Sequence, residues 1–344
     1  MANDFFCIDL GESFIRISDI KKAGNLFEAK SLGMIDVDPV FFRAEAEGVT
    51  EKQAAVLSKA IAQLKITKKN VNIVIPDSYS YNQFIETPKL NEKELLSAIK
   101  YQADQFIPMP LEEINLDIEI LKDDEKNKKI LTLIAAAPKK IVSKVESLAE
   151  YAGLAPQTIE TEISAIGRLI GDVFKPQAKT ETPQGFLFIN LNFSSTSVYF
   201  FDKSLGILVF SYNFSIGYNL FLKEIQINLN VDQKKAIELL KTLGMSKNAS
   251  YNLQAILTPV VKDFLGEIQK AITLLKQKYN TQVTNIYTFN ETSRFHALEE
   301  IIGKYFAIPT SNFNLYSMFA KNSTVDALKN DLGFFVPSIG ANLR

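Results

Sequence analysis

The sequence contains one cysteine, Cys7, and one histidine, His296, among its 344 residues. A single cysteine cannot form an internal disulfide, and so few thiol and imidazole groups cannot build a zinc scaffold. The 38 basic and 39 acidic side chains give a net charge of -1. Binding to a phosphate backbone needs a strong positive field, which this balance does not supply. These absences exclude disulfide-rich and zinc folds and argue against nucleic acid as a partner.

Long apolar runs are also missing from the chain. No stretch approaches the roughly 18 consecutive apolar residues that a membrane-spanning helix requires, and residues 1–4 lack the basic region of a secretion signal. Apolar residues make up 47% and charged residues 22% of the sequence, which is typical of a globular protein. We therefore expect a soluble cytosolic protein with two structural units or one duplicated body.

One part of the chain repeats the pattern of another. Residues 5–17 read as a strand, a polar turn and a strand, and residues 186–200 do the same. A third β-rich run follows each of them, at residues 26–37 and 207–216, and helical sequence and a further strand come next. Two β-β-β-α-β units predict an α/β protein with two similar lobes that face each other across a cleft.

The segment between the two repeats fits neither of them. Asn91 is a suitable N-cap for a helix that would extend to residue 106. Residues 116–120 and 130–136 look like a hairpin, and residues 139–152 like a second helix that ends at Gly153. The pattern predicts an inserted α-β-β-α subdomain.

Two further features organise the second half of the chain. Residues 175–185 are polar and contain proline, which is typical of a linker between lobes. Apolar residues repeat at helical spacing from Leu257 to Tyr279 and predict a helix of about six turns, followed by a strand at residues 285–289. We expect this apolar stripe to be part of the core.

The element order and several segments resemble the PilM family of type IV pilus assembly proteins, which are actin-like and related to the cell-division protein FtsA. Residues 8–16 are similar to the opening phosphate loop of the family. Residues 102–117 are more specific, because they resemble the family's E-x-x-x-Y-I-P-F-P-L-x-E run, and residues 88–90 match the P-x-L that precedes it. Residues 135–139 and 152–154 also fall where the family has similar segments.

The resemblance implies an actin-like (RNase H-like) α/β fold with two lobes and an inserted α-β-β-α subdomain. The first lobe would comprise residues 1–87 and 161–180, with residues 320–344 returning to it. The insert would comprise residues 88–160, and the second lobe residues 185–319.

The resemblance also implies partners and a location. Proteins of this family lie in the cytosol at the inner face of the cytoplasmic membrane, form a ring or cuff, and bind the cytoplasmic N-terminal tail of the membrane protein PilN in a groove near the insert. Contact with the membrane would then be peripheral, through the partner.

The family is also taken to bind ATP and Mg²⁺ between its lobes. The first turn keeps the three residues that this implies, Asp9, Gly11 and Ser13, with Asp9 as the carboxylate that would hold Mg²⁺. Small residues matter in such turns, because a Cβ atom blocks the approach of a phosphate.

The second turn departs from the family pattern. Where the family has Asp-x-Gly, this chain has Asn190 and Asn192, so that the carboxylate has become an amide and the glycine has gained a side chain. Ser194 could still contact phosphate through its hydroxyl. Two unit charges about 4 Å apart interact by on the order of 4 kcal/mol at an effective dielectric near 20, and the amide forfeits that attraction for a cation.

The nucleoside end of the implied site is altered as well. The family's pair of glycines appears here as Asn290 and Glu291. Asn290 can still adopt a positive φ, but Glu291 would place a bulky anion where a purine should pass close to the backbone. Glu162 matches the position on the connecting helix that orients water in active relatives, and it is the one candidate for a catalytic base.

These departures favour a cytosolic scaffold of a type IV pilus, or of a related type II secretion machine, that binds ATP weakly or not at all and does not hydrolyse it. We therefore do not expect an enzyme. Two alternatives stay open at this point. One is an active ATP-binding or ATPase protein of the actin fold, and the other is a filament-forming cytoskeletal protein. The sequence does not distinguish a closed ring from a filament.

Overall fold

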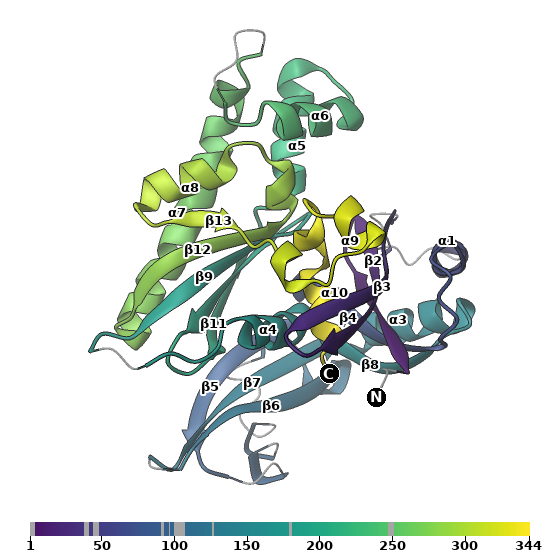
Figure 1. Ribbon diagram of the computed structural model, residues 1–344. Coiled ribbons are helices and arrows are strands. Elements are labelled where there is room, and N and C mark those ends of the chain that lie inside the picture. The colour runs from purple at the N-terminus through teal and green to yellow at the C-terminus, as the bar shows by residue number, and fades with distance from the viewer. Residues whose placement is uncertain are drawn as a thin grey trace. The chain divides into compact units, whose positions relative to one another are not determined.

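A computed structural model describes most of the chain (Figure 1). The described residues are 4–37, 41–43, 48–90, 93–95, 97–99, 107–125, 127–178, 181–246 and 251–344. The chain divides into two compact units. Unit 1 comprises Met1–Leu169, Val209–Ser211 and Pro337–Arg344, and unit 2 comprises Ile170–Leu208 and Tyr212–Val336.

Unit 1 is built on a five-stranded sheet in the order β3-β2-β1-β4-β8. Its strands are β1 (Phe5–Leu10), β2 (Phe14–Ala23), β3 (Leu26–Asp36), β4 (Asn70–Ile75) and β8 (Ala155–Thr161). The first three strands form the antiparallel meander that the repeated pattern predicts, while β1, β4 and β8 run parallel. Strand β8 lies at one edge and has one neighbouring strand in this sheet.

The two faces of this sheet are covered by different helices, because side chains alternate along a strand. Phe6 and Ile8 pack on one face against α1 (Val49–Gln63) and α3 (Lys139–Tyr151). Cys7 points to the opposite face, where it packs with Ala165 of α4 (Glu162–Val173) and Ala341 of α10 (Val336–Ala341). Asp9 shares the face of Cys7, and the strand therefore directs it toward the α4 side.

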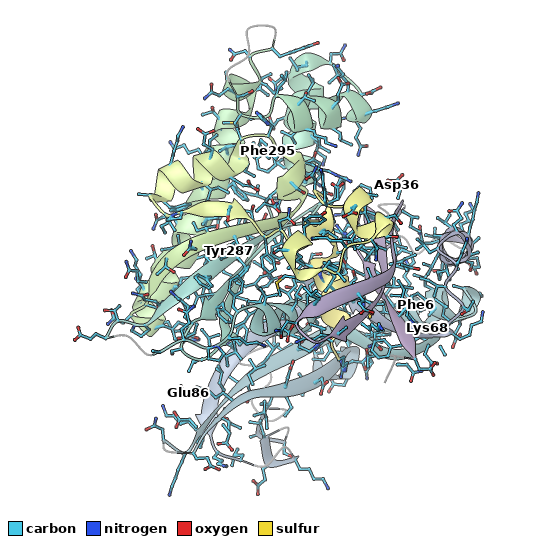
Figure 2. All side chains as sticks on the ribbon, viewed as in Figure 1. Phe6, Asp36, Lys68, Glu86, Tyr287 and Phe295 are labelled. Atoms are coloured by element: carbon cyan, nitrogen blue, oxygen red, sulfur yellow. The ribbon has the colours of Figure 1, made fainter. Side chains whose placement is uncertain are left out.

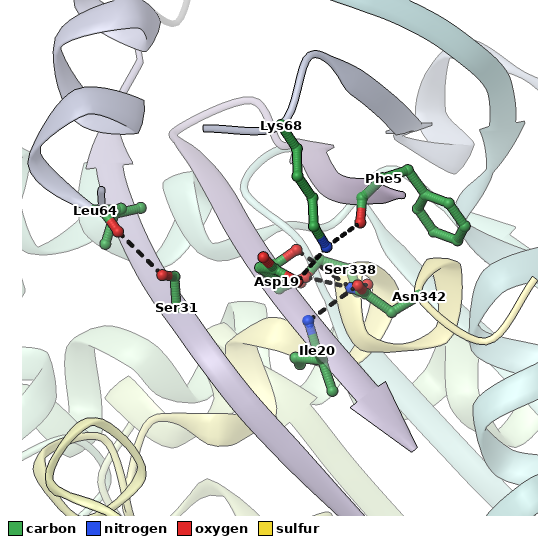
Figure 3. A network of polar contacts seen from close by, with 9 residues as sticks. Phe5, Asp19, Ile20, Ser31, Leu64, Lys68, Ser338 and Asn342 are labelled. Atoms are coloured by element: carbon green, nitrogen blue, oxygen red, sulfur yellow. Dashed lines mark hydrogen bonds and ion pairs between the residues drawn. The ribbon is translucent and has the colours of Figure 1, made fainter. Parts of the chain in front are cut away.

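The C-terminal residues of unit 1 are tied to β2 by a polar network (Figure 3). The Asn342 side chain accepts a hydrogen bond from the Ile20 backbone N–H at 3.1 Å and donates to the Ser18 hydroxyl at 2.7 Å. Nearby, Lys68 Nζ lies 2.8 Å from Asp19 Oδ1 and donates to the Phe5 carbonyl at 2.9 Å. The Asn342 contacts fix the end of α10 against β2, and the Lys68 contacts join the residues before β4 to β1 and β2.

The inserted segment forms a second, three-stranded sheet in the order β5-β7-β6. Strands β6 (Ile114–Asp124) and β7 (Lys129–Pro138) are the predicted hairpin. The helix that follows ends as expected, with Gly153 at φ +70°. The remaining strand, β5 (Tyr81–Pro88), pairs with β7, although residues 81–87 were expected in the first lobe and only residue 88 in the insert. Of the helix expected over residues 91–106, residues 93–95 and 97–99 are helical and the others lie outside the described residues.

Unit 2 repeats the sheet of unit 1, with the order β11-β10-β9-β12-β13. Its strands are β9 (Gln184–Leu191), β10 (Thr196–Asp202), β11 (Ile207–Phe214), β12 (Gln282–Asn290) and β13 (Thr310–Asn312). Its helices are α5 (Tyr218–Leu229), α6 (Gln233–Thr242), α7 (Leu253–Tyr279), α8 (Leu298–Phe306) and α9 (Ser323–Ala327). Short 3₁₀ turns lie at Asp77–Tyr79, Leu111–Glu113, Glu291–Arg294, Tyr316–Met318 and Leu332–Phe335. The predicted duplication is therefore confirmed.

Aromatic side chains pack together on the unit 2 sheet, around Tyr287 of β12 (labelled in Figure 2). The Phe174 ring lies 5.0 Å from the ring of Phe186 and 5.5 Å from that of Tyr287, measured between centroids. Offset and edge contacts of this kind add about 0.5–1.5 kcal/mol per pair beyond the burial of apolar area. Helix α7 includes the predicted stripe from Leu257 and begins four residues before it. None of the helices among the described residues is both long and apolar enough to cross a membrane.

Candidate functional site

The turn after β1 holds the first three predicted site residues. Asp9 lies near the end of β1, and the Gly11 N–H donates to the Phe14 carbonyl at 2.9 Å, which closes the turn. A Cβ atom on Gly11 would lie 2.4 Å from Arg16 Nη1 and 2.7 Å from the Phe14 oxygen. The position therefore requires glycine. Ser13 is half-buried in the same turn, and its carbonyl accepts the Val37 N–H at 3.1 Å.

Asp9 is paired with Arg16, a residue that the sequence analysis missed. The antiparallel register of β1 and β2 sets the two residues opposite each other, and Arg16 Nη1 lies 3.3 Å from Asp9 Oδ2. Both side chains are buried, at 0% and 3% exposed. Burial raises the pKa of Asp9 to about 6, although the Arg16 charge opposes that rise. Asp9 Oδ1 has no hydrogen-bond partner among the described residues. A charged residue seven positions after Asp9, between Ile15 and Ile17, was the available signal.

Glu162 lies at the start of α4, where its carboxylate accepts the Asp77 backbone N–H at 3.1 Å. The Asp77 side chain in turn accepts the Ile163 N–H at 3.3 Å. Burial, followed by the charges of Asp77 and Asp9, raises the pKa of Glu162 well above its usual range. Glu162 therefore keeps its proton at pH values where an ordinary glutamate has lost it, and its contacts are those of a residue that joins two turns of unit 1.

The turn after β9 brings three of the predicted residues together. Asn290, at the end of β12, donates from Nδ2 to Asn190 Oδ1 at 3.0 Å and to Asn192 Oδ1 at 2.6 Å. The three side chains are at most 7% exposed. Since β9 and β12 are parallel neighbours, their carboxyl ends lie at the same edge of the sheet, which explains the meeting. The amides are bonded to one another.

The backbone of Asn290 adopts a conformation that usually requires glycine. Asn290 has φ +67° and ψ -129°, so the expected positive φ is confirmed. Non-glycine residues in such regions carry about 1–3 kcal/mol of strain. A Cβ atom on Gly217 would lie 2.4 Å from the backbone of Ser194, which shows how closely α5 approaches the turn. The Tyr218 N–H donates to the Asn192 carbonyl at 2.9 Å, so that the turn itself satisfies the first amide of α5.

Glu291 is buried directly after Asn290, at 1% exposed. Its carboxylate lies 3.7 Å from Arg294 Nη1. Burial raises the pKa of Tyr218, and the Glu291 charge raises it further. Ser194 is half-buried in the turn, which ends where the Thr196 hydroxyl donates to the Ile216 carbonyl at 2.6 Å. Buried side chains of the protein, Glu291 among them, thus fill the space beside this turn.

The two turns differ in their fitness for Mg²⁺. The unit 1 turn offers the Asp9 Oδ1 oxygen, which has no hydrogen-bond partner among the described residues. Asp9 lies close to Gly11, where the backbone leaves no room for a Cβ atom. The unit 2 turn offers amides that are already bonded to each other, and residues 190–196 include no carboxylate. No cluster of three or more His, Cys, Asp or Glu side chains suited to a metal occurs in the part of the chain that the structure describes. The unit 2 residues do not fit the role that magnesium requires.

Unit 1 also contains a cavity of about 680 Å³ beside the insert sheet. The resemblance implied a groove near the insert, but the sequence predicted none of the residues that line this cavity. Its volume is within the range of roughly 300–1,000 Å³ typical of ligand sites. It is lined by residues 115–119 of β6, 133 and 135–137 of β7, and 158–161 of β8, together with side chains of α4 and the C-terminal segment. Because Asn115, Asp117 and Glu119 alternate along β6, they share one face of the insert sheet, next to the small side chains of Ala135 and Ala137.

The wall formed by β8 and α4 carries most of the polar groups in this cavity. Both carboxylate oxygens of Glu160 accept from Arg168 Nη2 at 2.6 Å, and Arg344 Nη1 lies 3.4 Å from Glu160 Oε2. The hydroxyls of Thr158 and Thr161 have no hydrogen-bond partner among the described residues. Thr161 is 5% exposed. A buried hydroxyl without a partner costs about 1–3 kcal/mol, and a ligand can remove that cost.

Comparisons with known proteins agree on the fold. A family model described as type IV pilus assembly protein PilM matches residues 7–344. A solved structure called the PilM-PilN type IV pilus biogenesis complex covers 100% of this chain and 99% of its own, at 17% identity and a TM-score of 0.84. The ethanolamine utilization protein EutJ from Carboxydothermus hydrogenoformans covers 98% and 88%, at 10% identity and a TM-score of 0.54. The strand order that repeats in the two sheets is that of the actin-like (RNase H-like) fold, so the predicted fold class is confirmed.

Proposed function

The chain belongs to the type IV pilus assembly protein PilM family, and we propose that it is a scaffold that binds the cytoplasmic N-terminal tail of a PilN-like inner-membrane protein. The proposed site is the unit 1 cavity between the insert sheet and β8. The single observation that carries the proposal is this cavity, with its unpartnered threonine hydroxyls and its two flanking edge strands. The solved structure with the high TM-score is named as a complex with PilN, which supports the same class of partner.

The edges of the two unit 1 sheets support an extended ligand. Strand β6 has only β7 beside it in the described part of its sheet, and β8 has only β4. A strand at a sheet edge presents unpaired N–H and C=O groups, to which an extended peptide can add through main-chain hydrogen bonds. Since both edge strands line the cavity, a tail could pair with one of them while its side chains enter the cavity.

We also propose that the chain does not hydrolyse ATP and binds it weakly or not at all. The amide cluster of Asn190, Asn192 and Asn290 supports this, because it contains no anion that could hold Mg²⁺. The burial of Glu291 and the raised pKa of Glu162 point the same way. An active ATPase of this fold would need a second turn with a carboxylate.

This function would place the protein in the cytosol at the inner face of the cytoplasmic membrane, held there by its partner. We propose a type IV pilus machine as the setting, with a type II secretion machine as the related alternative. Self-association into a ring or a filament belongs to the same proposal, and electron microscopy of concentrated protein distinguishes the two forms.

A direct test uses a fluorescent peptide that covers the cytoplasmic N-terminal tail of the PilN-like protein encoded in the same genome. Fluorescence anisotropy should give saturable binding to the full chain. Ala135→Phe fills the cavity and should weaken binding at least tenfold, because the new ring takes the space of the ligand. Ala55→Phe is the matched control, since it makes the same change at an exposed alanine of α1 in unit 1, which neither lines the cavity nor lies in an edge strand. Equal affinities for the two variants would refute the site.

A further inference from the structure

The charged side chains that line the unit 1 cavity do not balance one another. Three carboxylates line it, Asp117, Glu119 and Glu160, against two guanidinium groups, Arg168 and Arg344. Both guanidinium groups are within 3.4 Å of Glu160. No ion pair within 4 Å joins Asp117 or Glu119 to a cation in the described residues. The negative charge of the cavity is therefore concentrated on the β6 side.

Glu119 is the more buried of the two β6 carboxylates. Asp117 is exposed, and its Oδ1 accepts the N–H of the next residue at 2.9 Å. Glu119 is partly buried on the face of β6 that lines the cavity. The charged groups around it are Arg168, Glu160 and Arg344. Burial raises the pKa of Glu119, the charge of Glu160 raises it further, and the two arginines lower it. The net result is a raised pKa for a partly buried carboxylate that has no ion pair within 4 Å among the described residues.

We infer that the cavity selects a peptide segment that carries a lysine or arginine side chain, which Glu119 receives while the segment's polar groups reach the Thr161 hydroxyl. The inference rests on the proposed function, because it specifies the chemistry of the tail that this cavity would bind. A cation beside Glu119 would form a charge-assisted hydrogen bond and restore the charge balance of the cavity. A segment with an acidic side chain at this point would meet like charges, and a purely apolar one would desolvate Glu119 without any compensation.

Thr161 supplies a second and independent reason for a polar ligand. Its side chain is 5% exposed and lines the cavity, and its Oγ1 has no hydrogen-bond partner among the described residues. A hydroxyl can donate one hydrogen bond and accept others, so a backbone carbonyl or amide of an extended segment satisfies it. An apolar ligand would leave this group unsatisfied.

The test is a double-mutant cycle with the labelled tail peptide and the full chain. Each basic residue of the tail is replaced in turn by glutamine, and each peptide is titrated into the wild type and into Glu119→Gln. We expect one basic position whose replacement weakens binding to the wild type roughly fivefold to tenfold, as loss of a charge-assisted hydrogen bond does. The same replacement should change binding to Glu119→Gln by less than about twofold, because the partner charge is already gone.

The control variant is Glu51→Gln, which removes an exposed carboxylate of unit 1 that does not line the cavity and should leave all affinities unchanged. If the tail binds but no basic position matters, or if the losses in wild type and Glu119→Gln are equal, the inference is wrong while the proposed function stands. If no tail peptide binds the wild type, the proposed function itself is wrong, and the inference with it.

Discussion

The cavity of unit 1 and the turn after β9 in unit 2 are both rich in polar side chains, but they use them differently. In the turn, one amide of Asn290 donates to both Asn190 and Asn192. In the cavity, the hydroxyls of Thr158 and Thr161 have no partner among the described residues. Polar groups that bond to one another stabilise the fold, whereas polar groups without a partner can bind a ligand. The oxygens of Asn190 and Asn192 are thus used within the turn, whereas the threonine hydroxyls of the cavity are not used by the described residues.

The largest effect is expected where a buried charge loses its partner. Arg16→Met removes the cation that lies 3.3 Å from Asp9 and keeps a side chain of similar length. Above pH 7 we expect the free energy of unfolding in urea to fall by about 3–5 kcal/mol, because an uncompensated carboxylate stays buried. The double variant with Asp9→Asn should recover most of this loss. The affinity of the folded protein for the tail peptide should be unchanged. A loss of affinity would show that the Asp9–Arg16 pair also contributes to peptide binding.

Breaking the amide cluster should have the next largest effect. Asn290→Ala removes two hydrogen bonds, leaves the oxygens of Asn190 and Asn192 buried, and keeps a side chain at φ +67°. We expect a loss of about 2–4 kcal/mol in urea unfolding. Asn290→Gly should lose less, because glycine adopts this conformation without strain. Equal losses in the two variants would show that backbone strain has no part in this turn.

The pH dependence of stability should report Asp9. Its pKa is raised from 3.8 to about 6 in the folded protein. Between about pH 4 and pH 6 the unfolded chain has lost this proton and the folded protein keeps it, so the free energy of unfolding falls as pH rises through that window. The wild type should lose about 2–3 kcal/mol relative to Asp9→Asn across it. A flat difference between the two proteins from pH 4 to 7 would contradict the raised pKa.

The smallest change in stability is expected in the cavity, and it should be of opposite sign. Thr161→Val replaces a buried hydroxyl that has no partner with a methyl group of the same shape. We expect the free energy of unfolding to rise by about 1 kcal/mol, while the affinity for the tail peptide falls. A variant that is more stable but binds the peptide more weakly would indicate that the Thr161 hydroxyl contributes to ligand binding and not to folding. A variant that is destabilised and binds normally would place Thr161 among the structural residues instead.

Much of the fold could be predicted from local pattern. The two repeated hairpins led to both five-stranded sheets, and the turn of charged residues after residue 122 led to the β6-β7 hairpin. Strand β5 was missed because its assignment depends on pairing with β7, about 50 residues later in the chain, rather than on its own sequence. The run at residues 102–117, which carried much of the resemblance, lies partly outside the described residues.

The predicted site residues that lie at the ends of strands could be identified from the sequence, because the strands themselves were predicted. Asp9, Asn190 and Asn290 each lie at or near the carboxyl end of a strand, a position that the repeated pattern already indicated. Arg16 was missed because its meaning depends on the register opposite Asp9. The residues that line the cavity were missed for a stronger reason: they come from β6, β7, β8, α4 and the C-terminal segment, which only tertiary packing brings together.

The most direct test of the account is a calorimetric titration of the full chain with the tail peptide, in the presence and in the absence of ATP and magnesium. The account predicts saturable binding with one dissociation constant under both conditions, since the cavity lies within unit 1 and the amide cluster of unit 2 offers no anion for the metal. Tail binding that requires ATP and magnesium, or no tail binding under either condition, would contradict it.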